Sequence, residues 1–232
     1  RVLQFSDIHY GEGSVDTQGD RNDEKSKVFQ ERMLTSLKPD LVVLNGDMFS
    51  NYGAPGLCAS LLNCTDWFVE QWEKFTMPMR AAGIPYAYVL GNHDWMARPF
   101  PPKARDVIRY DIKYGNTSLT REAPEGLSGA SVYYLPIYSD RDKRPTAVLW
   151  MMDSGMDNCT SFTGWGCIEA DQVQWFEKTA STDDLAGVQG IMFAHIPFVE
   201  VSTLSNLYGA RGISGAKGEP IACSSANTGI FT

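Results

Sequence analysis

Polar side chains able to bind metal ions follow short apolar runs of this sequence. The residues of this kind are Asp7, His9, Asp47, Asn92, His93, Asp94 and His195. A single histidine beside an apolar run is more often a core or surface residue than a ligand. Here, all three histidines of the chain follow such runs. Carboxylate, amide and imidazole donors together suit borderline divalent or trivalent metal ions, and Asp47 is the natural bridge between two of them.

Apolar runs and helical periodicity alternate in the first half of the chain. Strands are predicted at 2–5, 40–44 and 86–90, and helices at 24–37 and 66–82. Strands that alternate with helices form parallel sheets through crossover connections. Because the carboxyl ends of parallel strands meet at one edge of a sheet, we expect the polar clusters after these strands to lie close together, with Asp47 on the central strand.

The second half of the chain is less regular. The further elements expected are helices at 103–114 and 169–180, and strands at 130–137, 145–152 and 190–194. The charged turn 139–144 is expected to join two of these strands as antiparallel neighbours. His195 directly follows the last strand. With no internal repeat and no clear boundary, residues 1–232 are expected to form a single domain.

Charge and hydropathy narrow the classes of partner. The net charge of −8, from 28 acidic and 20 basic residues, disfavours nucleic acid or an anionic membrane as a partner. No apolar run of the sequence approaches the ~20 residues that span a bilayer, so no membrane helix is expected.

The positions of the cysteines and asparagines favour an oxidising compartment. Two cysteine pairs, Cys58 with Cys64 and Cys159 with Cys167, are close enough in sequence for local disulfides, which leaves Cys223 unpaired. Three sequons, at Asn63, Asn116 and Asn158, are possible N-glycan sites. Together these features favour a protein of the secretory pathway, secreted or vacuolar, over a cytosolic protein with reduced cysteines.

The ordered set of motifs resembles the calcineurin-like metallophosphoesterase superfamily. The motifs are Asp7-x-His9, Gly46-Asp47, Gly91-Asn92-His93-Asp94 and the strand-borne His195. Within that superfamily the chain is most similar to the purple-acid-phosphatase-like branch of plants, fungi and protists. That similarity is carried by the segments 5–10, 164–166 and 224–231. The resemblance implies an α/β fold, a four-layer sandwich of two mixed β-sheets flanked by helices.

The resemblance also implies a role for each site residue. Asp7 and His9 would bind a first metal ion, Asp47 would bridge, and Asn92 and His195 would bind a second. The ions would be Fe, Zn or Mn. His93 would face the phosphate of a small phosphorylated substrate and donate a proton to its leaving group, with Asp94 orienting His93. The implied reaction is hydrolysis of phosphate monoesters by a metal-bound hydroxide.

Two departures from the family pattern are visible. The tyrosine that colours purple acid phosphatases would stand where this chain has Ser50, so no tyrosinate-to-iron absorption is expected unless Tyr52 supplies it. The family's last motif, Gly-His-x-His, would follow Phe231 closely, but the sequence ends at Thr232. We therefore expect a piece of a longer protein, without the closing strands of its second sheet. The sequence also begins within a predicted strand, which favours residues before Arg1.

Two alternative functions stay open. A phosphodiesterase or nucleotide hydrolase would use the same metal site, because the motifs do not distinguish monoesters from diesters. A secreted glycoprotein that keeps the fold as a structural or binding module without catalysis is the other alternative, favoured by the missing last motif.

Overall fold

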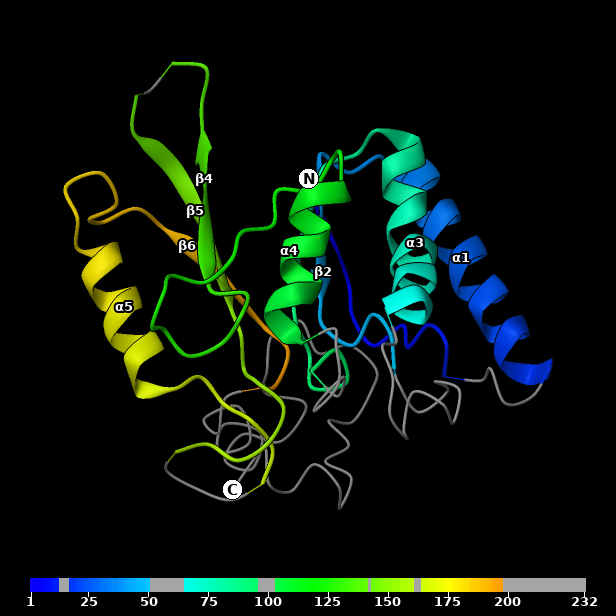
Figure 1. Ribbon diagram of the computed structural model, residues 1–232. Coiled ribbons are helices and arrows are strands. Elements are labelled where there is room, and N and C mark those ends of the chain that lie inside the picture. The colour runs from blue at the N-terminus through cyan, green and yellow to red at the C-terminus, as the bar shows by residue number, and fades with distance from the viewer. Residues whose placement is uncertain (13–16, 51–64, 96–102, 142, 161–163, 198–232) are drawn as a thin grey trace, which may run out of the picture.

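The computed structural model describes residues 1–12, 17–50, 65–95, 103–141, 143–160 and 164–197 (Figure 1). Several residues singled out in the sequence lie outside these ranges: Cys58, Asn63, Cys64 and Cys223, together with Tyr52 and the tail 224–231.

A parallel sheet is built by the first half of the chain. Its strands are β1 (Val2–Phe5), β2 (Leu41–Asn45) and β3 (Tyr86–Val89), in the order β1-β2-β3. Both pairings are parallel, with Val2 opposite Leu41 and Asn45 opposite Val89. The predicted crossover topology is therefore confirmed, and β2 is the central strand of the three.

Three helices accompany this sheet: α1 (Thr17–Leu37), α3 (Thr65–Ala82) and α4 (Ala104–Tyr114). The predicted start of the first helix, at residue 24, was wrong by two turns. Its early turns carry no apolar periodicity, so local sequence does not reveal them. A long-range contact helps to hold this end, because Asp23 pairs with Lys74 of α3 at 3.0 Å and accepts a hydrogen bond from the Gly11 amide.

A mixed sheet is built by the second half. Its strands are β4 (Tyr133–Tyr138), β5 (Pro145–Met152) and β6 (Gly190–Ala194), and helix α5 (Ala170–Ala180) precedes β6. β4 and β5 are antiparallel, as predicted, whereas β5 and β6 are parallel. β4 begins three residues later than predicted because the amides of Ala130 and Ser131 donate to the Asp153 carboxylate.

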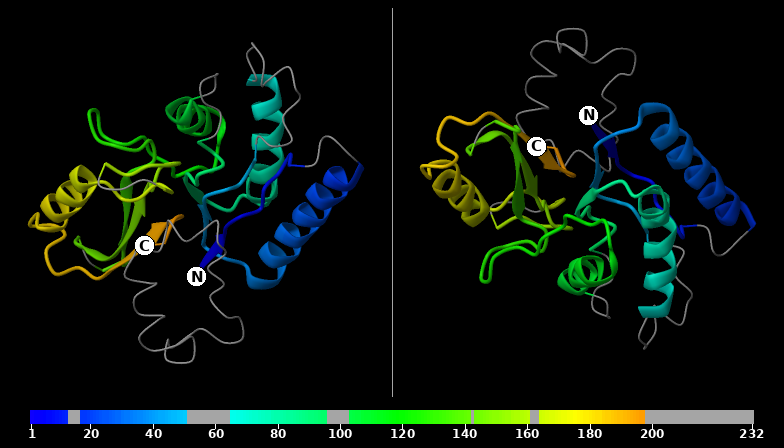
Figure 2. Two further views of the ribbon diagram at one scale, coloured as in Figure 1. Left: turned by 90° about the horizontal axis from the view of Figure 1, so that it is seen from below. Right: turned by 90° about the horizontal axis from the view of Figure 1, so that it is seen from above.

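The two sheets pack face to face, with helices on both outer sides (Figure 2). Alternation along β2 produces the layers: Val43 packs towards the second sheet, whereas Val42 and Leu44 face the opposite way. The core between the sheets contains Val43, Ala87, Val89, Tyr133, Leu135, Leu149, Met151 and Phe193. The result is the expected four-layer α/β sandwich.

The structure also bears on the compartment expected from the sequence. Cys159 and Cys167 form a disulfide, one of the two predicted pairs. Asn116 and Asn158 are both exposed. Among the described helices, none combines the length and apolar character needed to cross a bilayer.

Candidate metal centre

The loops that leave β1 and β2 run side by side at the carboxyl edge of the first sheet. The amide of Asp7 donates to the Gly46 carbonyl at 3.1 Å, and that of His9 donates to the Asp47 carbonyl at 3.0 Å. Asp7, His9 and Asp47 all adopt left-handed backbone angles, with φ of 57°, 55° and 53°. Such conformations cost non-glycine residues ~1–3 kcal/mol each and concentrate at functional sites.

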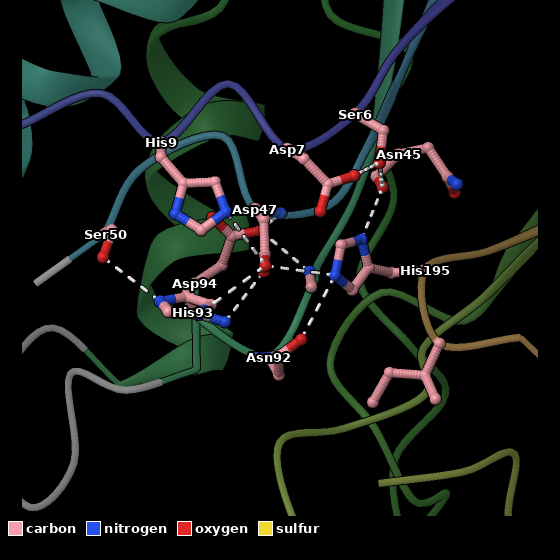
Figure 3. A network of polar contacts seen from close by, with 12 residues as sticks. Ser6, Asp7, His9, Asn45, Asp47, Ser50, Asn92, His93, Asp94 and His195 are labelled. Atoms are coloured by element: carbon pink, nitrogen blue, oxygen red, sulfur yellow. Dashed lines mark hydrogen bonds and ion pairs between the residues drawn. The ribbon is translucent and has the colours of Figure 1, made fainter. Parts of the chain in front are cut away.

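Asp47 lies at the centre of the site, and three histidines surround it (Figure 3). Its Oδ2 atom is 3.1 Å from Nε2 of His195, 3.4 Å from Nε2 of His9 and 3.9 Å from Nε2 of His93. The other carboxylate oxygen, Oδ1, accepts the backbone amide of His93 at 2.8 Å. The structure thus brings together three histidines that lie 84 and 102 positions apart along the sequence.

His195 enters this site from the second sheet. Its Nδ1 atom lies 2.9 Å from the Asn45 carbonyl, which can only accept, so in the neutral ring Nδ1 carries the proton. Nε2 is then the lone-pair nitrogen, and it lies 3.2 Å from Oδ1 of Asn92. Asp7, which contacts the Ser6 hydroxyl, borders the same space.

Burial and mutual charge shift the acidities of these groups. Burial opposes ionisation of Asp47, but hydrogen bonds from His195 and His9 outweigh it and lower the Asp47 pKa. Burial likewise acts against protonation of His195, yet the Asp47 carboxylate raises its pKa to about 9. The pKa of His9 is raised in the same way, against burial, by Asp47. For His93 burial prevails and lowers the pKa.

Asp94 has a different place from the one expected. We expected its carboxylate to orient His93, but among the described residues it accepts four backbone amides, from Gly91, Asp47, Met48 and Phe49, at 2.8–3.3 Å. The side chain is fully buried. Burial and the Asp47 charge raise the pKa of Asp94, while the amide donors act in the opposite direction. Asp94 therefore joins the turn after β2 to the turn after β3, which carries His93.

Two glycines allow these turns to approach closely. A Cβ atom on Gly46 would lie 2.5 Å from Cγ of His195, and one on Gly91 would lie 2.5 Å from the Asp47 amide nitrogen. Gly46 also has a φ of 81°, which favours glycine. Each glycine directly precedes a candidate ligand, Asp47 or Asn92. The two glycines therefore set how closely the chain segments after β2, β3 and β6 approach one another.

Residues of the second sheet support the site, and sequence reasoning assigned them no function. Asp153 accepts a hydrogen bond from the Trp95 indole at 2.9 Å. The Ser131 hydroxyl accepts the Leu90 amide at 2.9 Å. Ser154 similarly accepts the amide of Ile196, directly after His195, at 3.1 Å. Only the position of Asp153 and Ser154 at the end of a predicted strand could have signalled this role.

The side chains around Asp47 form two groups of candidate metal ligands. Two groups of candidate ligand atoms, each within 4.8 Å of one another, share Asp47: His9 with His93, and Asp7 with His195. Asn92 lies beside the second group. The expected ligand sets, Asp7 with His9 and Asn92 with His195, stay a prediction. These groups are composed differently, because they join Asp7 with His195 and include His93, which was expected to face the substrate. Carboxylate oxygens and imidazole nitrogens around one central carboxylate fit a pair of bridged cations.

The family of this chain follows from comparison with known sequences, which agrees with its fold and its site. Residues 1–223 match the calcineurin-like phosphoesterase family, so the chain belongs to that family. All of the chain aligns with two Arabidopsis thaliana proteins, "Probable inactive purple acid phosphatase 29" at 23% identity and "Probable inactive purple acid phosphatase 14" at 24%. Over 86% of its length it is 24% identical to "Phosphatase DCR2" of Saccharomyces cerevisiae.

The relatives are longer proteins. The chain spans 62% and 61% of the two plant proteins and 35% of the yeast protein. The match to proteins named as purple acid phosphatases agrees with the branch predicted from the motifs.

Proposed function

We propose that this protein is a phosphatase that hydrolyses phosphate monoesters with the help of two metal ions, Fe, Zn or Mn. The observation that carries the proposal is the convergence of three histidine Nε2 atoms within 3.9 Å of one carboxylate oxygen of Asp47. The residues that would hold the ions are Asp7, His9, Asp47, Asn92 and His195. When bound, the two cations would supply charge to orient the phosphate and to lower the pKa of a water molecule.

His93 is the proposed proton donor to the leaving group. Burial lowers its pKa, which makes the protonated ring a stronger acid. Its backbone amide is held by Asp47, and the preceding turn is held by Asp94. The ring is therefore positioned by the same carboxylates that organise the site. In this proposal His93 contacts substrate, and Asp94 positions it indirectly.

Two other functions remain candidates. A phosphodiesterase would differ in the loops 50–64, 95–106 and 155–167, and most of the first two lies outside the described residues. A binding module without catalysis is favoured by the plant relatives, whose names include "probable inactive". Those names describe the plant proteins.

The test measures hydrolysis of an aryl phosphate and of a diaryl phosphate by the full chain with added zinc, manganese or iron. We expect monoester turnover that requires metal, is lost in Asp47→Asn, and falls by ~10²–10⁴-fold in His93→Ala. Asp183→Asn, at an exposed position, is the matched control. Faster diester turnover would support the phosphodiesterase. Metal-dependent phosphate binding without any turnover would support the binding module.

We further propose that the chain is a single domain, 1–232, of a secreted or vacuolar glycoprotein. The Cys159–Cys167 disulfide and the exposed sequons at Asn116 and Asn158 support this compartment. Removal of N-glycans from protein expressed in a eukaryotic cell should increase its gel mobility, and no mobility change would argue against it. With Ser50 in the tyrosine position, the iron-loaded protein should lack the purple absorption.

A further inference from the structure

Asp153, directly after β5, is a fully buried residue whose carboxylate accepts five hydrogen bonds among the described residues. Its Oδ2 atom accepts the amides of Ala130 and Ser131, at 2.7 and 3.0 Å, and the Ser131 hydroxyl at 3.1 Å. Its Oδ1 atom accepts the Trp95 indole and the Gly155 amide, both at 2.9 Å. Because both oxygens are engaged in a buried position, each of these donors is held in a fixed place.

Two of these hydrogen bonds connect Asp153 to the turn after β3. The first comes from the indole of Trp95, which directly follows residues 91–94. The second comes from the Ser131 hydroxyl, which also accepts the amide of Leu90 at 2.9 Å, and Leu90 directly precedes residues 91–94. The second sheet therefore holds both ends of the short segment that carries the candidate ligand and the proposed proton donor.

The next residue of the chain holds the opposite side of the metal centre. The Ser154 hydroxyl accepts the amide of Ile196, directly after His195, at 3.1 Å. Oδ1 of Asn92 lies 3.2 Å from Nε2 of His195 (Figure 3). Asp153 and Ser154 are adjacent, so one end of β5 holds the two segments whose candidate ligands face each other.

We propose that Asp153 is a positioning residue, which fixes the turn of residues 90–95 to the second sheet and thereby sets Asn92 opposite His195. The attachment of the turn rests on the hydrogen bonds, whereas its effect on metal binding rests on the proposed function. Asp94 has a complementary place, because it ties the same turn to the loop after β2, within the first sheet. A turn held by the first sheet alone is free to shift relative to the second sheet and its ligand.

The other end of β3 offers a matched control. Asp111 of α4 is also fully buried, and its carboxylate accepts the indole of Trp72 at 2.8 Å and the hydroxyl of Tyr86 at 2.6 Å. Tyr86 begins β3, whereas the metal centre lies beyond the carboxyl end of that strand. Asp111→Asn and Trp72→Phe are therefore the matched controls for Asp153→Asn and Trp95→Phe.

Amide hydrogen exchange of the full chain, free of metal, shows whether the turn stays attached. In either orientation, the asparagine of Asp153→Asn turns its NH₂ group towards one of the two connections. Local opening of the turn should then become easier, and the amides of Leu90 and Gly91 should exchange about fivefold faster than in the wild type. Asp111→Asn should leave these two amides unchanged and speed the exchange of the Tyr86 amide instead.

Zinc binding, measured by calorimetry on the folded variants, shows the effect on the metal centre. Groups that orient metal ligands from behind are worth about 10–100-fold in metal affinity, so Asp153→Asn should weaken zinc binding about tenfold and Asp111→Asn should not. Trp95→Phe and Ser131→Ala should each lose part of that affinity, and the double variant should lose about as much as Asp153→Asn. Trp72→Phe should bind zinc as the wild type does.

Two results would overturn the proposal. Unchanged exchange of the Leu90 and Gly91 amides in Asp153→Asn would show that the turn does not depend on Asp153. Equal zinc affinity in Asp153→Asn and Asp111→Asn would show that Asp153 contributes to folding alone. Should Asp153→Asn not fold, Trp95→Phe and Ser131→Ala decide in the same two measurements. A wild-type protein that binds no zinc would refute the proposed function, and the exchange measurement, which requires no metal, would still decide whether Asp153 holds the turn.

Discussion

Replacing Asp94 with asparagine should destabilise this protein far more than the loss of one charge implies. The carboxylate accepts two backbone amides on each oxygen, at 2.8–3.3 Å, in a fully buried position. Asparagine offers one oxygen and one NH₂ group, so in either orientation two amide donors face another donor. A buried donor left without an acceptor costs about 1–3 kcal/mol, which gives about 2–6 kcal/mol for the variant.

The measurement is urea unfolding of Asp94→Asn and wild type, free of metal and at neutral to mildly alkaline pH. The matched control is Asp183→Asn, an exposed position where such a change should stay within ~0.5 kcal/mol. Because Asp94 joins the turns that carry Asp47 and His93, zinc affinity should also fall. Unfolding energies of Asp94→Asn and wild type that agree within the error of the control would refute the reasoning. That result would mean that Asp94 is already protonated in the folded protein, since a carboxylic acid and an amide have similar hydrogen-bonding groups.

Three further predictions concern other parts of the structure. In the metal-free protein the pKa of His195 is raised to about 9, so its protonated form stabilises the fold. This stabilisation is fully present below the pKa of His195 in the unfolded chain and is lost as the pH rises towards 9. Urea unfolding should show a loss of about 3 kcal/mol over that range. Gly91→Ala should abolish zinc binding in calorimetry, because its Cβ would lie 2.5 Å from the backbone nitrogen of Asp47. Gly83→Ala is the control: its Cβ would have no neighbour within 4 Å, so the variant should lose only about 1 kcal/mol of unfolding free energy, from its positive φ. Replacing Cys159 and Cys167 with serine should cost about 2–3 kcal/mol of unfolding free energy, from the entropy of the released loop.

Each of these three predictions would be refuted by a specific result. A metal-free stability that does not decline above pH 6.5 would show that His195 is neutral beside Asp47. Undiminished zinc affinity in Gly91→Ala would show that the turns can separate without loss of the site. Equal stability of the oxidised and the serine protein would show that the loop 159–167 is held by its other contacts.

Much of the fold was accessible from local patterns. Apolar runs predicted all six strands of the described sheets, and their alternation with helices predicted the parallel first sheet. The aromatic positions of α3 were predictable as core for the same reason: Phe68, Trp72 and Phe75 recur at helical spacing, and all are buried. The early turns of α1 were missed because their support comes from Lys74, about fifty residues away, which leaves no periodic trace.

The sequence by itself determined which residues meet. Parallel strands place their carboxyl ends at one edge, so Asp7, Asp47 and Asn92 had to converge there once the crossover pattern was recognised. Their types then indicated metal chemistry, because carboxylate and amide oxygens with the imidazoles of His9 and His93 beside them are typical ligands of metal ions.

Only the tertiary structure decided what each group does within that site. Asp94 is next to His93 in the sequence, yet its carboxylate binds the loop after β2. The left-handed backbone at Asp47 directs the amides of residues 47–49 towards the Asp94 carboxylate. Ser50 and Glu12 are 38 positions apart, and their contact depends on the loops after β1 and β2 lying in register. Hydrogen bonds require distances and directions within a few tenths of an ångström, and those are set by packing between distant segments. Residue types and order therefore determined the class of site, and the packed loops determined which contacts each group makes.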